Sequence, residues 1–188
     1  MFGYCFGLVS AMSIAMMTVS LDSNLQAWSV VNDGVMGGVS AGRMIKAEGA
    51  LRFEGELSLD NNGGFSSVRR LVDQDLAGAV SVRIQVRGDG RTYQFRIRHD
   101  GRFDAVSWRA EFTTSSDWQT LDLPLDEFIP VFRGRRVPSA GPVEPASIQQ
   151  VGFLLADKQP GPFALEIRSI EFVTTQDPEL KQAASEQP

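Results

Sequence analysis

Strict alternation of hydrophobic and polar residues is the feature that most constrains what this chain can fold into. It runs through stretches that begin near residues 51, 80, 93 and 106. A period of two residues indicates β-strands that bury one face and expose the other. The hydrophobic faces are formed by Leu51, Phe53, Gly55, Leu57 and Leu59, then Val80, Val82, Ile84 and Val86, then Tyr93, Phe95 and Ile97, and finally Val106, Trp108, Ala110 and Phe112.

The connections between these stretches are short and rich in glycine, asparagine and aspartate. Such residues supply the positive φ that tight hairpins need. We therefore expect the strands around 80–87, 91–99 and 104–112 to form one antiparallel meander. Residues 124–128 are expected to form a single helical turn that Pro130 ends, and no longer amphipathic helix is predicted. Further strands are predicted at residues 65–72, 118–123, 151–156 and 163–173.

Many short strands without alternating helices predict an all-β fold, for which we favour a β-sandwich of the jelly-roll kind. The 188 residues suit one domain with a sizeable core. We assign this domain to residues 21–175. An apolar leader at 1–20 precedes it, and a polar, flexible tail at 176–188 follows it.

The leader has two interpretations. It is apolar enough for the core of a signal peptide, but it contains no Lys or Arg, and a secretory signal normally opens with positive charge. Met12, Met16 and Met17 are alternative starts, which would make the segment dispensable. We expect a cytoplasmic protein, with export to the periplasm as the alternative if residues 1–20 act as a signal. No stable membrane span is predicted.

The composition narrows the possible functions. The formal net charge of -5 disfavours general nucleic-acid binding through a basic surface. One cysteine, Cys5, and one histidine, His99, offer neither an internal disulfide nor a thiolate zinc site. No nucleophile elbow accompanies His99. We therefore predict no catalytic residues, no metal site and no cofactor.

The stretch "NDGVMGGVS" at residues 32–40 contains three glycines within an otherwise apolar segment. Its spacing matches neither a dinucleotide-binding fingerprint nor a phosphate loop, and no helix is predicted after it. Glycine is the default where a Cβ cannot be accommodated. We interpret the stretch as a bend where backbone passes close to a neighbouring element. We expect Met36 to pack inward and a side chain at Gly37 to clash.

Arginine supplies most of the positive charge, and it favours planar, bidentate anionic partners. On the strands expected to pair, the arginines fall on the polar side. Their structural alternative is cross-strand pairing with Glu54, Glu56 or Glu111. One sheet face is therefore predicted to be cationic, formed by Arg83, Arg87, Arg96, Arg98 and Arg109.

A second arginine group lies in the loop "FRGRR", where no acidic residue occurs between Glu127 and Glu144. Both groups could bind an acidic protein surface, a phosphate or a sugar acid. The candidate binding residues are Arg96, Arg98, Arg133, Arg135 and Arg136.

Two further motifs have local explanations. Arg87-Gly88-Asp89 spells an integrin-recognition tripeptide, but a predicted hairpin turn accounts for its glycine and aspartate. Asn32 with Asp33, residues 60–62 and Asp157 offer oxygen ligands of the kind calcium takes. No contiguous calcium-loop pattern exists, and local hydrogen bonds explain such residues in turns.

Several segments, in order, resemble the complex I intermediate-associated protein 30 family. The resemblance covers about residues 28–173 and implies a galactose-binding-like jelly roll. The short chain, which lacks a dehydrogenase-like companion domain, is similar to bacterial single-domain members. The segments are Trp28 with "VNDGVMGGVS" (31–40), "FEGELSLDNNGGFSSVR" (53–69), "RGDGRTYQFRI" (87–97), "DWQTLDLPLDEFIPVFRGRRV" (117–137) and "IQQVGFLLADKQPGPFALEIRSIEF" (148–172).

The resemblance implies a non-catalytic, chaperone-like factor for assembly or stability of a respiratory or related complex. Mitochondrial members of the family assist assembly of NADH:ubiquinone oxidoreductase, so protein subunits are the expected partners. The alternative is a carbohydrate-binding module, with Trp28, Trp108 and Trp118 as candidate sugar platforms. The family signature, which we expect to be structural and near a partner surface, comprises Trp28, Asn32, Asp33, Met36, Gly37, Gly38 and Ser40.

Overall fold

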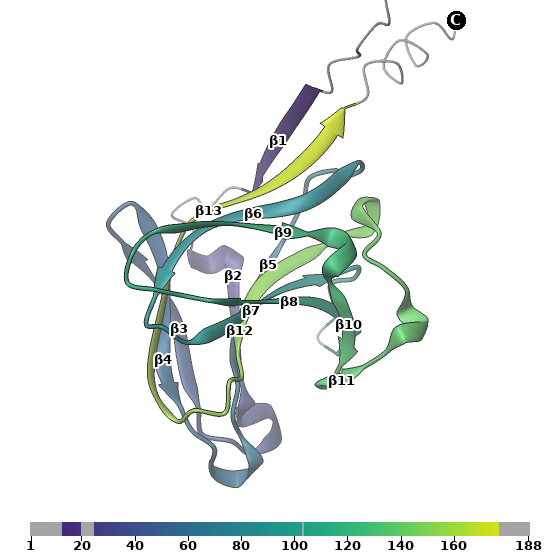
Figure 1. Ribbon diagram of the computed structural model, residues 1–188. Coiled ribbons are helices and arrows are strands. Elements are labelled where there is room, and N and C mark those ends of the chain that lie inside the picture. Colours follow the sequence, from purple (N-terminus) through teal and green to yellow (C-terminus); the bar gives the residue numbers. More distant parts are fainter. Residues whose placement is uncertain (1–12, 20–24, 103, 177–188) are drawn as a thin grey trace, which may run out of the picture.

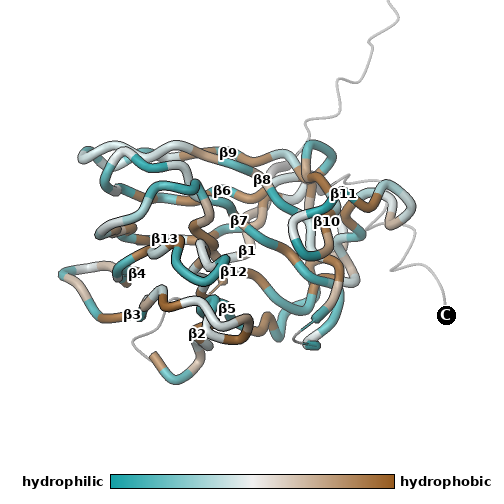
Figure 2. Tube along the Cα trace, turned by 90° about the horizontal axis from the view of Figure 1, so that it is seen from below, coloured by the Kyte–Doolittle hydropathy of each residue, from teal (hydrophilic) through white to brown (hydrophobic). Residues whose placement is uncertain are grey.

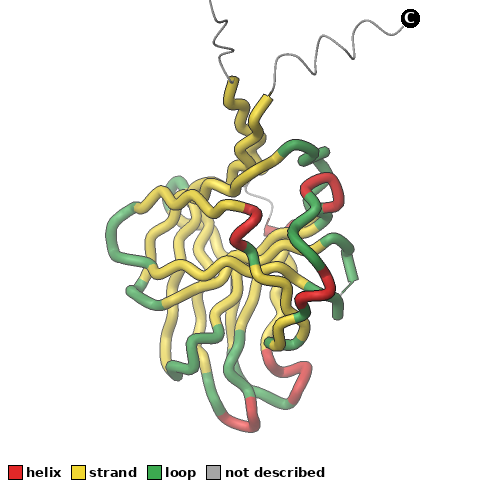
Figure 3. The backbone as a smooth tube through the Cα atoms, turned by 45° about the vertical axis from the view of Figure 1, so that its right-hand side comes forward, coloured by secondary structure: helices red, strands yellow, loops and turns green. Residues whose placement is uncertain are grey.

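The computed structural model describes residues 13–19, 25–102 and 104–176. Two antiparallel sheets pack face to face, and short 3-10 turns occupy their connections (Figures 1 and 3). The described residues contain no α-helix. The predicted all-β jelly-roll sandwich is confirmed.

The first sheet has six strands in the order β3-β4-β13-β6-β9, with β1 also paired to β13. The long strand β13 is its spine, because β4 pairs with the first part of β13 and β1 with the last part. The strands are β1 (Ser13–Val19), β3 (Ala41–Ala47), β4 (Ala50–Leu57), β6 (Ala79–Gly88), β9 (Gln119–Pro124) and β13 (Gly161–Gln176).

Part of the predicted leader belongs to this sheet. Ser13–Val19 pairs with the last residues of β13, and the two strands extend beyond the sandwich as a ribbon (Figure 1). A domain that begins at residue 21 therefore leaves out one strand. Residues 1–12 and 20–24 lie outside the described residues, as does the predicted tail from residue 177 onward.

The second sheet has seven strands in the order β11-β10-β8-β7-β12-β5-β2. Its strands are β2 (Trp28–Asn32), β5 (Ser66–Leu71), β7 (Thr92–Arg98), β8 (Ser107–Thr113), β10 (Ile129–Phe132), β11 (Arg135–Arg136) and β12 (Gln150–Leu155). The 3-10 turns are η1 (Leu25–Ala27), η2 (Asp33–Met36), η3 (Asp60–Asn62), η4 (Leu125–Glu127), η5 (Pro138–Ala140) and η6 (Pro145–Ser147). The turn η4 confirms the helical turn predicted at 124–128.

The core lies between the two sheets and is built from the alternating hydrophobic positions. Phe53 of the first sheet and Phe95 and Phe153 of the second are fully buried, and their rings contact neighbouring aromatic rings. Hydrophobic and hydrophilic positions alternate along the strands in Figure 2. The polar residues between the core positions therefore point away from the opposite sheet.

The predicted meander of strands 80–87, 91–99 and 104–112 is wrong in one strand. β7 and β8 do pair, but β6 lies between β13 and β9 in the other sheet. Residues 88–91 therefore carry the chain across the sandwich rather than around a hairpin. Asp89 holds this crossing, because its carboxylate accepts from the Ala164 amide at 2.8 Å and from the Tyr93 hydroxyl at 3.0 Å.

Candidate functional site

The glycine-rich signature forms the crossing between the two sheets from β2 to β3. η2 begins at Asp33, directly after β2, and the chain enters β3 at Ala41. Asp33 is the centre of this turn, and its side chain is completely buried at 0% exposure. A buried carboxylate is costly unless hydrogen bonds satisfy it, so its partners decide whether the turn is stable.

The Asp33 carboxylate accepts hydrogen bonds from two separate segments. Oδ1 accepts from the Ser40 amide at 2.9 Å, and Oδ2 accepts from the Ser40 hydroxyl at 2.5 Å. Oδ2 also accepts from the amides of Gly64 at 2.6 Å and Phe65 at 3.3 Å. The carboxylate thus joins the signature to the turn that precedes β5.

These hydrogen bonds determine the ionisation of Asp33. Burial by itself raises the pKa, but the bonds from the Ser40 side chain, the Gly64 amide, the Ser40 amide and the Phe65 amide together lower it below its usual value. Hydrogen bonds to a charged carboxylate favour the charged form. Asp33 is therefore ionised at neutral pH, and its charged form organises the turn.

The two adjacent glycines serve different purposes. Gly37 has a φ of 91°, which favours glycine, but a Cβ there would meet nothing within 4 Å. A Cβ on Gly38 would lie 2.4 Å from Cγ of Asp33. The predicted close approach therefore exists at Gly38, and the expected clash at Gly37 was wrong because that residue faces open space.

Asn32 binds the edges of the two sheets to each other. Its Oδ1 accepts from the Ser66 hydroxyl of β5 at 2.6 Å and from the Gly42 amide of β3 at 3.2 Å. A Cβ on Gly42 would lie 2.0 Å from the Ser66 hydroxyl oxygen. Asn32, Asp33 and Ser40 therefore have structural roles, and Trp28 packs in the core against Phe153.

The outer side of the signature turn displays apolar side chains. Val35 and Met36 are each 61% exposed and Val39 is 56% exposed, with Leu59 at 41% on the neighbouring connection. The prediction that Met36 packs inward was wrong, because Asp33 takes the inward position of this 3-10 turn. We call Val35, Met36 and Val39 the apolar tip.

The "FRGRR" loop is a two-residue hairpin turn between β10 and β11. Arg133 and Gly134 both have positive φ, at 47° and 77°, as a type I′ turn requires. Arg133 pairs with Asp104, and its guanidinium lies over the Phe132 ring. Arg135 and Arg136 are exposed, so they remain available as candidate binding residues.

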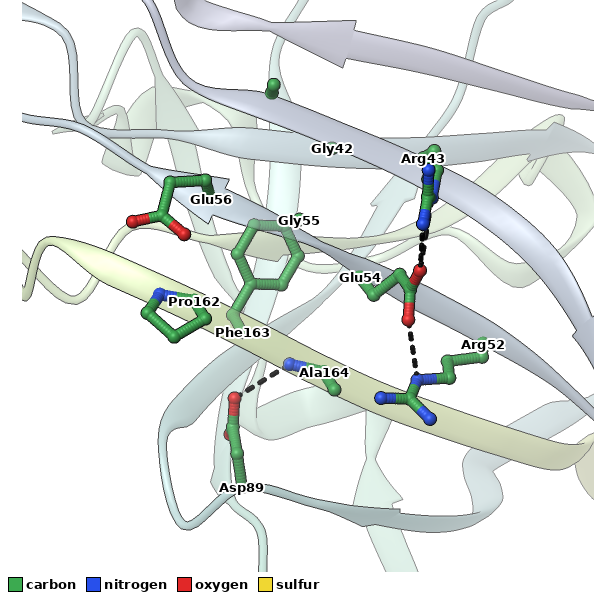
Figure 4. Close-up of a pocket in the computed structure, with 11 residues that line it drawn as sticks. Gly42, Arg43, Arg52, Glu54, Gly55, Glu56, Asp89, Pro162, Phe163 and Ala164 are labelled. Carbon is green, nitrogen blue, oxygen red and sulfur yellow. Dashed lines mark hydrogen bonds and ion pairs between the residues drawn. The ribbon is translucent and has the colours of Figure 1, made fainter.

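Arginines on the outward face of the six-stranded sheet are paired with acids. Arg43 and Arg52 both contact Glu54, at 2.6 and 2.9 Å, and Arg87 contacts Glu166 at 2.7 Å. Figure 4 shows Glu54 between Arg43 and Arg52. These residues line a hollow of about 590 Å³. Both arginines and acidic residues line this hollow, and several of them are paired with each other. The hollow therefore favours neither an anionic nor a cationic ligand.

Arg96 and Arg98 are placed differently from the prediction. They lie on the other sheet from Arg83 and Arg87, so a single cationic face was wrong, and they are only 8% and 5% exposed. Arg96 donates to Gln94 Oε1 at 2.6 Å and to the Ser107 hydroxyl at 2.6 Å. Among the described residues, neither Arg96 nor Arg98 forms an ion pair with a carboxylate.

Arg69 lies on the same outward face of the seven-stranded sheet as Arg96 and Arg98, and it was not among the residues predicted from the sequence. It is 9% exposed and lies on the outward side of β5, because Val68 next to it is fully buried. The signal was present in "SSVRRL", where the core position at Val68 places Ser67 and Arg69 on the opposite side.

The remaining candidates have structural surroundings. The His99 ring stacks on the Trp108 ring with the ring centroids 3.9 Å apart, and Nε2 of His99 accepts a hydrogen bond from the Glu144 amide at 3.1 Å. Asp157 pairs with Arg91 at 2.7 Å. Within the described ranges, no group of His, Cys, Asp and Glu side chains has the arrangement of a metal site.

Two of the three candidate aromatic platforms for a sugar site are buried, and the half-buried Trp118 is partly covered by arginines. Trp28 and Trp108 are both 5% exposed, and the guanidinium groups of Arg87 and Arg168 lie over Trp118 at 4.9 and 3.9 Å. No described helix has the length and apolar character that a transmembrane helix needs.

Solved structures with this fold include carbohydrate-binding modules. The family 11 module of a cellulosomal cellulase from Clostridium thermocellum has a TM-score of 0.68 at 14% identity, covering 88% of this chain and 98% of its own. The same type of module in complex with a β-1,3-1,4-mixed-linked tetrasaccharide has a TM-score of 0.66, with coverage of 86% and 97%, again at 14% identity. At this identity the likeness shows the fold alone.

Two curated relatives are each named "Complex I intermediate-associated protein 30, mitochondrial". The one from Mus musculus is 33% identical over 110 residues, which cover 56% of this chain and 34% of the relative. The one from Drosophila melanogaster is 27% identical over 169 residues, which cover 76% and 57%. This chain thus spans about a third to just over half of the length of these relatives.

The sequence profile of the family described as "Complex I intermediate-associated protein 30" matches residues 17–167. The match includes the buried Asp33, the apolar tip and most of both sheets. The chain belongs to the complex I intermediate-associated protein 30 family.

Proposed function

We propose that this protein is a non-catalytic, chaperone-like binding module that supports the assembly or stability of a respiratory or related multi-subunit complex. Membership of the family and the names of its curated relatives support this role. The expected partners are protein subunits of that complex.

The apolar tip is the observation that carries the proposal. Val35, Met36 and Val39 are exposed, yet the turn beneath them is held by the completely buried Asp33. A rigid turn that presents apolar side chains suits protein association, because little conformational entropy is lost on binding. Arg135 and Arg136 supply a second, cationic contact surface elsewhere on the sandwich.

Affinity capture with the full chain tests this role. The tagged protein should recover subunits of a respiratory complex, identified by mass spectrometry, and deletion of the gene should lower the level of that complex. Val35→Ser with Met36→Ser should weaken recovery, whereas Leu71→Ser should not, although Leu71 is equally exposed at 62%. Unchanged complex levels after deletion, together with no recovered subunits, would contradict the proposal.

Carbohydrate binding is the second candidate, and only the likeness to carbohydrate-binding modules supports it. The covered tryptophans weigh against stacking of a sugar ring on them. A glycan array read at millimolar sugar concentration tests this candidate directly, and the absence of any bound glycan would remove it.

A further inference from the structure

A row of arginines crosses the outward face of the seven-stranded sheet. In the strand register, Gly152 of β12 lies opposite Arg69 of β5 on one side and Arg96 of β7 on the other. Arg96 in turn lies opposite Arg109 of β8. The row therefore crosses the four neighbouring strands β5, β12, β7 and β8, which lie about 4.8 Å apart. Arg98 lies on the same face, two residues along β7 from Arg96. We call the four arginines, Arg69, Arg96, Arg98 and Arg109, the arginine row.

The centre of the arginine row has no side chain. A Cβ on Gly152 would lie 2.2 Å from the Val68 carbonyl oxygen. Backbone does not yield as the end of a flexible side chain does, so the packing of β12 against β5 requires glycine. The position between Arg69 and Arg96 is therefore kept without a side chain by the fold itself.

Buried polar atoms without a partner gather on this face. Among the described residues, Nε of Arg98, Nε of Arg109 and Oε1 of Gln150 are buried and form no hydrogen bond. Gln150 is the register partner of Arg98, and the two residues are only 8% and 5% exposed. Buried polar groups in native proteins nearly always have partners, so these atoms have hydrogen-bonding capacity for a further partner.

The electrostatic surroundings support the same conclusion. Burial and the nearby Arg69 and Arg96 lower the pKa of Arg98 to about 9. Burial, together with Arg109 and Arg69, lowers the pKa of Arg96 to about 10. A guanidinium group strongly resists losing its proton. Asp100 near Arg98 and Glu111 near Arg96 oppose these shifts only in part. An anion in the arginine row would therefore relieve the repulsion that remains.

We propose that the arginine row binds a small oxyanion, a carboxylate or phosphate group, through Arg96, Arg98 and Arg109. Arg96 and Arg98 are buried, so the flat surface of a macromolecule would not reach them. We therefore expect a small ligand. Arg109, whose side chain is 25% exposed and contacts the half-exposed Glu111 at 3.1 Å, marks the side from which the anion enters. Guanidinium groups bind both oxyanions in bidentate geometry. This site is remote in sequence from the apolar tip and does not depend on the assembly role.

Thermal unfolding of the full chain tests the site, with citrate and inorganic phosphate as separate probes and sodium chloride at matched ionic strength as the reference. At several times its Kd, a bound anion should raise the Tm by about 3 °C or more above the chloride reference. The probe that raises the Tm, or that raises it at the lower concentration, identifies whether the site prefers a carboxylate or a phosphate. Isothermal titration calorimetry then gives the Kd and the stoichiometry.

The variants separate this site from general charge effects. Arg98→Gln should abolish the shift, and Arg135→Gln, which removes an exposed arginine from the β10–β11 hairpin, should retain it. If Arg98→Gln does not fold, Arg109→Gln replaces it, because Arg109 is less buried. The proposal is overturned if neither probe raises the Tm beyond chloride, if Arg98→Gln and Arg109→Gln respond like the wild type, or if Arg135→Gln also loses the response.

Discussion

The signature turn and the arginine row both bury charge, but they satisfy it to different degrees. Asp33 is completely buried and accepts hydrogen bonds from Ser40, Gly64 and Phe65. Arg98 is nearly as buried, yet its Nε has no partner among the described residues, and Arg69 and Arg96 repel it more than Asp100 attracts it. A satisfied buried charge stabilises one conformation, whereas an unsatisfied one favours binding of a further partner.

The largest expected effect is at Asp33. Asp33→Ala should lower the free energy of unfolding by about 3–5 kcal/mol, because it leaves several buried donors without an acceptor. Equilibrium unfolding in urea measures the loss. A loss below about 1 kcal/mol would show that the carboxylate does not hold the turn.

A matched pair of buried arginines sharpens the comparison. Arg91 pairs with Asp157, and their side chains are 10% and 6% exposed. Arg91→Gln should therefore cost about 3 kcal/mol, because it leaves a buried carboxylate without its cation. Arg98→Gln should change the stability by no more than about 1 kcal/mol, or increase it, because it removes a repelled charge. Equal losses, read from urea midpoints, would contradict the difference between the two arginines.

The adjacent glycines give the next smaller effect. Gly38→Ala should cost about 2–3 kcal/mol, because its Cβ would overlap the Asp33 side chain. Gly37→Ala should cost only about 1–2 kcal/mol, because its positive φ is unfavourable but the surrounding space is open. Thermal unfolding of both variants tests the order, and a larger loss for Gly37→Ala would reverse the assignment.

Acid should weaken the signature turn selectively. The pKa of Asp33 is lower in the folded protein than its usual value of 3.8, so the unfolded chain binds the proton more readily. Its stabilising contribution is therefore full above that value and is lost as the pH falls through the folded pKa. Asp33→Asn should be less stable at neutral pH but should lose less on acidification. Unfolding curves between pH 5 and pH 2 of both proteins measure this, and parallel curves would exclude Asp33 as a source of acid sensitivity.

The smallest effect on stability is expected at the hairpin. Arg135→Glu should change the free energy of unfolding by less than about 0.5 kcal/mol, because the side chain is exposed. It should nevertheless weaken recovery of an acidic partner in affinity capture. A large loss of stability would instead show that the hairpin is part of the packed structure.

Much of this architecture could be predicted from local pattern. Alternation identified the strands and most of their buried residues, although Leu59 and Val80, expected on hydrophobic faces, are 41% and 45% exposed. Glycine-rich turns marked most of the connections. The pairing of β6 could not be predicted in this way, because alternation shows that a strand has a buried face but not which strand lies beside it. The outward positions of Arg96 and Arg98 were correct, but their burial was not foreseen.

The sequence by itself determined the β-sandwich, its family and the need for glycine in the signature, because periodicity and backbone freedom are properties of neighbouring residues along the chain. Only the tertiary structure decided that Asp33 turns inward while Met36 turns outward, and that arginines from separate strands form one row. Those outcomes depend on which segments, distant in sequence, pack against one another, and on whether each buried charge finds a partner there.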